Sequence, residues 1–90
     1  MTILQIVGYE PEHGCDHCGR ALLHGIALSD GRVVGATCFD KKLTKPKEYN
    51  GRKYRVGAEE IIRLARNARK SDQELRRMGL SIHHFQFTSV

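Results

Sequence analysis

Three cysteines, arranged as Cys15-x-x-Cys18 and then Cys38, are the residues whose spacing points most clearly to chemistry. Two residues between thiolates let both sulfur atoms face one ion, and glycines on either side, Gly14 and Gly19, let the backbone turn around it. A lone cysteine is more often a small buried apolar residue, and Cys38 by itself would be interpreted in that way. Taken together, the three cysteines predict a site for one Zn²⁺ ion.

A structural zinc site takes four ligands, so the cysteines leave one position to be filled. We expect His24 to fill it, because a hairpin that turns at Asp30-Gly31 would set His24 opposite Thr37 and next to Cys38. Asp40, two residues after Cys38, is the second candidate. The other histidines that could supply a ligand are His13 and His17 beside the first cysteine pair and His83 and His84 near the end of the chain.

A three-cysteine zinc ion with an open, water-bearing position would be catalytic instead. Deaminases with such a site carry an H-x-E stretch and a P-C-x-x-C stretch. This chain has no H-x-E, and its C-x-x-C follows Gly14 rather than a proline. No Ser/His/Asp arrangement, phosphate-cradling glycine loop or pair of carboxylates stands out either. We therefore expect a binding protein and not an enzyme.

Length and composition favour one small domain that depends on a bound metal ion for its stability. A chain of 90 residues supports a single core, and zinc contributes about 10–16 kcal/mol of apparent folding free energy to small metal domains. No stretch approaches the roughly 20 apolar residues of a membrane span, and residues 1–7 lack the basic start of a signal peptide. An odd cysteine count without an export signal argues against disulfides, so we expect a cytoplasmic protein with reduced thiols and no membrane partner.

The net charge of +5 is concentrated in the second half of the chain. Residues 1–40 carry two basic and five acidic side chains, whereas residues 41–77 carry thirteen basic and five acidic ones. A one-sided basic surface is expected for a protein that binds nucleic acid or an acidic protein surface.

The basic side chains form two groups. The first, between residues 41 and 55, is interleaved with tyrosines, and this mixture suits a phosphate backbone with stacked bases. The second follows helical spacing after residue 62. The alternatives are a solvated helix face, on which Glu59 pairs with Arg63, and tyrosines that serve packing. The residues expected to contact nucleic acid are Lys41, Lys42, Lys45, Lys47, Arg52, Lys53, Arg55, Arg63, Arg66 and Lys70.

Local patterns in the first half of the chain predict short strands. An apolar run from Ile3 to Val7, stopped by Gly8, predicts the first strand. The turn at Asp30-Gly31 predicts a hairpin in which Leu28 lies opposite Val33 and Ile26 lies opposite Gly35. Residues 39–43 predict one or two helical turns, and Asn50-Gly51 predicts the turn of a loop or second hairpin over residues 47–56.

The second half predicts two helices and a strand. Residues 58–70 combine an acidic first turn with one apolar face. Ser71-Asp72-Gln73-Glu74 matches a capping box and predicts a short helix from Asp72 to Met78, which Gly79 closes. Residues 82–90 predict a last strand that pairs with the first. The expected fold is a small α+β domain stabilised by zinc.

The stretch Cys15-x-His17-Cys18-Gly19-Arg20, followed by a hairpin and Gly35-x-x-Cys38-x-x-Lys41, resembles the treble-clef zinc finger. It is similar to the small three-cysteine fingers of bacterial and bacteriophage proteins. The resemblance implies a zinc-finger core over residues 14–43 within a single domain of residues 1–90, with a helical segment at residues 58–78. It also places Lys41 where such fingers carry their fourth ligand, which is a departure from their pattern.

Two functions follow from these patterns. The first is binding of nucleic acid, mainly through its phosphates, because nothing resembles a base-reading helix. The second is that of a protein-binding adaptor or inhibitor, such as a phage factor that acts on a host protein. In that case the basic half would meet an acidic patch, and the helix at Asp72–Met78 would offer Leu75 and Met78 as anchors.

Overall fold

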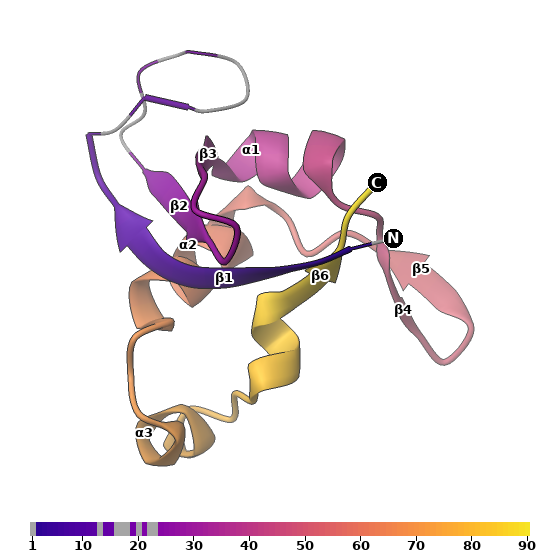
Figure 1. Cartoon of the computed structure of the whole chain (residues 1–90). Coiled ribbons are helices and arrows are strands. Elements are labelled where there is room, and N and C mark those ends of the chain that lie inside the picture. Colours follow the sequence, from indigo (N-terminus) through magenta and orange to yellow (C-terminus); the bar gives the residue numbers. More distant parts are fainter. Residues whose placement is uncertain (1, 13, 16–18, 20, 22–23) are drawn as a thin grey trace.

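A four-stranded antiparallel sheet organises the structure, a computed structural model that describes residues 2–12, 14–15, 19, 21 and 24–90 (Figure 1). The sheet contains β1 (Ile3–Glu10), β2 (Gly25–Leu28), β3 (Val33–Gly35) and β6 (Gln86–Thr88), in the order β3-β2-β1-β6. The predicted pairing of the last strand with the first is confirmed, because Leu4 lies opposite Phe87. The predicted α+β class is also confirmed.

The first strand is longer than expected, since it continues through Gly8 to Glu10. The ladder shifts between Ile6 and Gly8, as it does at a β-bulge. A Cβ atom at Gly8 would lie 2.9 Å from Nε of Arg69. Glycine therefore does not end the strand here; it lets the guanidinium of Arg69 approach the strand backbone closely.

The β2–β3 hairpin forms, but its predicted register is wrong by one residue. Ala27 lies opposite Val33 and Gly25 opposite Gly35, and the Leu28 N–H donates to the Arg32 carbonyl at 2.9 Å. The loop therefore has three residues and ends in Gly31, whose φ of +91° is in the left-handed region. Three-residue hairpin loops favour such a final glycine. This register no longer sets His24 opposite Thr37.

The second hairpin, β4 (Lys47–Tyr49) and β5 (Arg52–Tyr54), confirms the turn at Asn50-Gly51. Both turn residues have positive φ, 51° and 75°, which is the geometry of the two-residue turn that asparagine and glycine favour. Figure 1 shows this hairpin extending away from the four-stranded sheet.

The helices begin close to where the sequence predicted. The expected turns after Cys38 are π-helical η1 (Phe39–Leu43), which continues from α1 (Ala36–Cys38). Next come α2 (Ala58–Asn67), shorter than the predicted helix, and α3 (Asp72–Arg77). The Ser71 hydroxyl caps α3 by accepting the Glu74 N–H at 3.3 Å. Among the helices of the described residues, none is long and apolar enough to cross a bilayer.

The predicted strand over residues 82–90 is wrong in its first half, where η2 (Ile82–Phe85) forms a 3₁₀ turn. The cause is local, because the Ser81 N–H donates to Nδ1 of His84 at 2.9 Å and the Ser81 side chain caps the same turn. The histidines at positions 83 and 84 are therefore presented on a turn instead of alternating across a strand.

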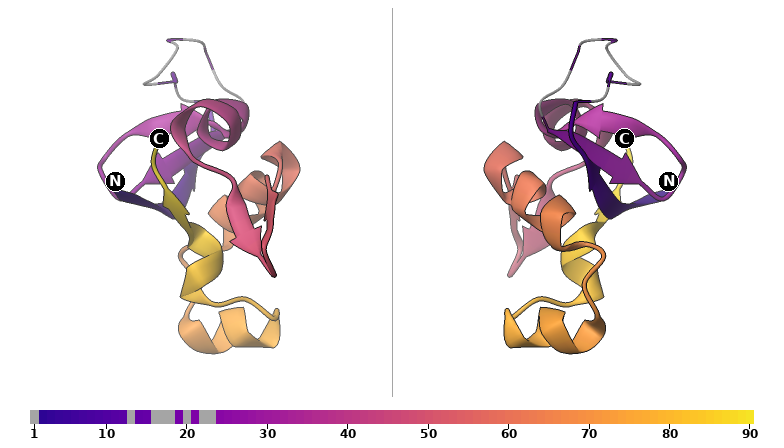
Figure 2. Two further views of the ribbon diagram at one scale, coloured as in Figure 1. Left: turned by 90° about the vertical axis from the view of Figure 1, so that its right-hand side faces the viewer. Right: turned by 90° about the vertical axis from the view of Figure 1, so that its left-hand side faces the viewer.

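The core lies between the sheet and the helices. Helix α2 packs on β1 and β2, on one side of the sheet (Figure 2). Its Ile61 and Leu64 are buried together with Ile6 and Ile26. Phe39 is fully buried and meets Phe87 edge to face, with ring centroids 4.9 Å apart. This aromatic pair joins η1 to the last strand.

Replacing Phe39 by alanine is expected to lower the free energy of unfolding by about 3–5 kcal/mol, because the cavity left in the core cannot collapse fully. Urea unfolding followed by circular dichroism measures this loss. Tyr49→Ala is the matched control, since Tyr49 is 70% exposed and its removal should change stability by less than about 0.5 kcal/mol. Equal losses in the two variants would contradict the assignment of Phe39 to the core.

Candidate functional site: the cysteine segment and a basic groove

The segment around the first cysteines turns back on itself. Gly14 and Ala21 form an antiparallel bridge, and the Cys15 carbonyl accepts a hydrogen bond from the Gly19 N–H at 2.8 Å. Gly19 has a φ of +77°, which only glycine adopts without strain. These contacts join Cys15 to Gly19 and Gly14 to Ala21. Cys18, His13 and His17 lie outside the described residues.

The Cys15 sulfur reaches the helix that carries Cys38. Cys15 is buried, and its Sγ accepts the N–H of Gly35 at 3.4 Å. Gly35 is the residue before α1, and Cys38, which is half-buried, is the last residue of α1. Two of the three predicted cysteine ligands are therefore attached to the same strand-to-helix junction.

The candidates for a fourth ligand have other contacts. The Tyr9 hydroxyl and His24 Nδ1 share a hydrogen bond. Asp40 is buried, and its Oδ1 accepts the Gly57 N–H at 3.4 Å, just before α2. In the described part of the chain, no three His, Cys, Asp or Glu side chains gather closely enough to hold a metal ion. The zinc site with Cys15, Cys18, Cys38 and His24 stays a prediction.

The predicted cationic face of α2 is already engaged by the protein itself. Nε of Arg63 lies 3.1 Å from Oε1 of Glu60, which is its partner in place of the expected Glu59. This hydrogen bond raises the pKa of Arg63. Arg66 lies over the Tyr9 ring, 5.2 Å from its centroid. Lys70 Nζ is 4.0 Å from the Met78 sulfur.

Arg55 has a structural contact that the sequence did not indicate. Its guanidinium donates to the carbonyls of Asp40 and Thr44, the latter at 3.1 Å. These carbonyls belong to η1 and the residue that follows it, and the α-helical bonding pattern leaves such terminal carbonyls without partners. Arg55 thus ties the end of β5 to η1.

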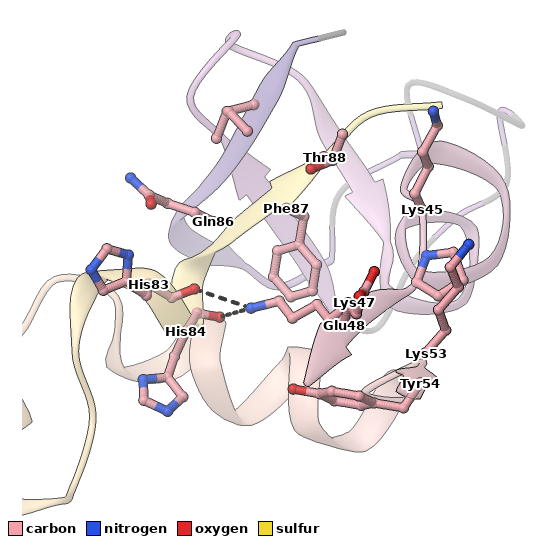
Figure 3. Close-up of a pocket in the computed structure, with 12 residues that line it drawn as sticks. Lys45, Lys47, Glu48, Lys53, Tyr54, His83, His84, Gln86, Phe87 and Thr88 are labelled. Atoms are coloured by element: carbon pink, nitrogen blue, oxygen red, sulfur yellow. Dashed lines mark hydrogen bonds between the residues drawn. The ribbon is translucent and has the colours of Figure 1, made fainter. Parts of the chain in front are cut away.

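A groove gathers the other cations of the hairpin region. It has a volume of about 710 Å³ and lies between the β4–β5 hairpin and the C-terminal segment formed by η2 and β6 (Figure 3). We call it the basic groove, and it is lined by Ile3, Lys45, Pro46, Lys47, Glu48, Lys53, Tyr54, His83, His84, Gln86, Phe87 and Thr88.

Lys47 crosses the basic groove and joins its two sides (Figure 3). Its Nζ donates to the carbonyls of His83 at 3.1 Å and His84 at 3.3 Å, and it lies 4.1 Å from the centroid of the Phe87 ring. Burial lowers the pKa of the Lys47 ammonium, because a charged group is less stable where water is excluded. Lys47 is thus half-buried and connects the hairpin to the C-terminal segment, so it is not a fully solvated cation.

The exposed cations of the groove are Lys45 and Lys53. Ion pairs between described residues join Arg32 to Asp30, Arg63 to Glu60 and Arg69 to Glu10, and Lys53 takes part in none of these. Of the other predicted contacts, Lys41 and Lys42 are exposed on η1, and Arg52 is exposed on β5. The groove therefore unites three of the ten predicted cations: Lys45, Lys47 and Lys53.

The sequence missed His83 and His84 as groove residues. They reach the hairpin because the last strand pairs beside residues 44 and 45: Thr44 bridges Ser89, and the Lys45 N–H donates to the Thr88 carbonyl at 2.8 Å. The only sequence signal related to this contact is the predicted pairing of the last strand with the first.

The structure corrects one feature of the protein-binding alternative. Leu75, which was expected as an anchor for a partner, is buried in the core at 7% exposure. Met78 at the end of α3 is exposed. A partner docking on α3 would therefore lack the first of its two predicted anchors.

No family model, curated protein or solved structure matched this chain.

Replacing Arg55 by alanine is expected to lower the free energy of unfolding by about 1–2 kcal/mol, because two carbonyls lose a charged donor. Arg55→Lys should recover only part of the loss, since an ammonium lacks the fork of donors of a guanidinium. Arg52→Ala is the control and should be close to neutral, since Arg52 is exposed on β5, three residues before Arg55. If Arg55→Ala proves as neutral as the control in urea unfolding, the structural role assigned to Arg55 is wrong.

Proposed function

We propose that this chain is a small zinc-stabilised protein that binds nucleic acid by contacting phosphates along the basic groove. The observation that carries the proposal is the gathering of Lys45, Lys47 and Lys53 in one groove that contains a single carboxylate, Glu48. A recess with such an excess of ammonium groups attracts a polyanion and concentrates it at the surface.

The three lysines of the groove contribute to phosphate binding in different ways. Lys45 and Lys53 are exposed and offer ammonium groups to phosphate oxygens. Lys47 adds positive potential from the middle of the groove while its Nζ stays bonded to two carbonyls. Contacts of this kind position a nucleic acid without reading its bases, so sequence discrimination should be low.

The helix face makes a smaller contribution. Arg63 and Arg66 each contact another side chain of the protein, Glu60 and Tyr9. Recruiting them to phosphates would require giving up these contacts, which for exposed groups cost about 0.2–1 kcal/mol each. In the groove, Lys53 is exposed and takes part in none of the ion pairs named above, and Lys45 is exposed beside it. The proposed interface is therefore centred on the groove.

Zinc enters the proposal as the ion that fastens residues 14–21 to α1. The donor chemistry fits, because thiolates are the ligands that structural zinc prefers. The Gly35 N–H that points at the Cys15 sulfur fits as well, since metal-bound thiolates are commonly held by backbone donors. Cys15, Cys18 and Cys38 would hold the ion, with His24 as the fourth ligand.

Neutralising the groove should weaken binding in a salt-dependent manner. In Lys45→Gln/Lys53→Gln, the slope of log K against log salt is expected to become shallower by about 1.4–1.8, since each neutralised phosphate contributes about 0.7–0.9. Fluorescence polarisation with labelled DNA and RNA between low and physiological salt measures the slope. Arg76→Gln/Arg77→Gln removes the same charge from α3 and is the matched control. Absence of binding to any DNA or RNA at low salt would refute the proposed function.

Removing zinc should unfold the chain. The binding energy of a structural zinc, about 10–16 kcal/mol, is as large as the whole stability of a small domain. Elemental analysis of the purified protein is expected to find one zinc ion per chain, and a chelator should abolish the cooperative melt. Cys15→Ser and Cys38→Ser should lose the metal, whereas Thr37→Ala, an exposed neighbour of Cys38, should keep it. A protein that is free of metal and still fully folded would disprove the zinc site.

A further inference from the structure

The basic groove carries aromatic rings as well as cations, and the rings indicate which form of nucleic acid fits. Tyr54 lies on one side of the groove and the rings of His83 and His84 lie on the other, with Lys47 between them (Figure 3). Tyr54 is 47% exposed, and both histidines are exposed. Flat rings on both sides of a recess offer stacking surfaces to a flat ligand.

The exposure of the two hairpin tyrosines contrasts with the burial of the three phenylalanines. Phe39, Phe85 and Phe87 all lie in the core. Tyr49 and Tyr54, in contrast, are exposed on the β4–β5 hairpin. The expectation that these tyrosines serve packing is therefore not met for Tyr49, which is 70% exposed. Their position beside exposed lysines makes them available to a partner.

The register of the hairpin puts both tyrosines on one face. Lys47 lies opposite Tyr54, and Tyr49 lies opposite Arg52. Because residues that are opposite or two apart share a face, these four side chains lie on the same face of the ribbon. Glu48 and Lys53 lie on the other face. A track of rings and cations therefore runs from the groove at Tyr54 toward Tyr49 near the turn.

The spacing along this track excludes a stacked duplex. Tyr49 and Tyr54 are diagonal neighbours across the ladder, and such neighbours are about 7–8 Å apart. Neighbouring bases of a duplex strand are only about 3.4 Å apart along the axis. Two successive bases can each stack on a tyrosine only when the strand is extended and unpaired. In a duplex the base faces are covered by neighbouring base pairs, and only the phosphates would reach the rim.

From this we infer that the basic groove and the adjoining hairpin face take a single-stranded nucleic acid, with bases stacked on Tyr54 and Tyr49. Its phosphates are held by Lys45 in the groove and by Arg52, which is exposed on the same face as the two tyrosines. The inference rests on the proposed function and narrows it to unpaired strands. Charge complementarity favours this occupant, since the groove contains three lysines and one glutamate. The volume of about 710 Å³ is within the range of small-ligand sites, so the recess can admit part of a nucleotide.

Polarisation titrations of the full chain against labelled 20-nucleotide oligo(dT), oligo(U) and a 20-base-pair duplex test the inference. Single strands are expected to bind at least about 10-fold more tightly than the duplex. Tyr54→Ala and Tyr49→Ala should each weaken single-strand binding by about 5- to 150-fold, the measured range for loss of one stacked base. Neither change should alter the salt slope, because no phosphate contact is removed. Tighter binding of either oligo(dT) or oligo(U) than of the duplex supports the inference.

Tyr54→Phe and Tyr49→Phe are the matched controls, since they keep the ring and should keep the binding. Equal binding of duplex and single strand, with both alanine variants unaffected, would overturn this inference and leave the proposed function standing. Displacement of oligo(dT) by polyglutamate as readily as by unlabelled oligo(dT) would also overturn it, because the groove would then be a general anion surface. If no nucleic acid binds at all, the inference and the proposed function fall together.

Discussion

The half-buried ammonium of Lys47 is the interaction on which the basic groove depends. Taking an ammonium out of water is costly unless donors find acceptors. Here the two acceptors are main-chain carbonyls 36 and 37 residues further along the chain, and an aromatic ring lies beside the charge. The Lys47 ammonium keeps these two acceptors only while the hairpin and the C-terminal segment stay together. The recess between them follows from that requirement.

Features that depend on neighbouring residues were the most accessible from the sequence. The turn at Asn50-Gly51 needs positive φ at both positions, and few residues other than asparagine and glycine supply it. The Ser71 cap required only a hydroxyl three residues before Glu74. The class of fold followed from such local signals. In each case the physical cause lies within a few residues of its effect.

Features were harder to predict from the sequence where two local structures compete or where distant residues come together. The β2–β3 loop could have two or three residues, and the position of Gly31 in the left-handed region decides for three. Residues 82–85 alternate like a strand, yet the contact from Ser81 to His84 favours a 3₁₀ turn. The groove arises from the pairing of residues 44 and 45 with the chain end. No local pattern contains that information.

The basic residues show why a count of charges does not locate an interface. Ten cations were expected to meet nucleic acid, but Arg55 supports a helix end and Arg63 pairs with Glu60. Such side chains have roles inside the protein that only the fold discloses. The cysteines differ from the cations, because their spacing alone predicts a zinc site, and among the described residues no three His, Cys, Asp or Glu side chains gather closely enough to hold an ion.

The position of β1 between β2 and β6 has a consequence for how the chain is made. One long edge of β1 finds its partner early, in residues 25–28, whereas the other must wait for residues 86–88. During synthesis the apolar N-terminal strand therefore keeps an open edge that can pair with other chains. Protection of this edge by chaperones would matter more for this protein than for one whose first strands pair only with close neighbours.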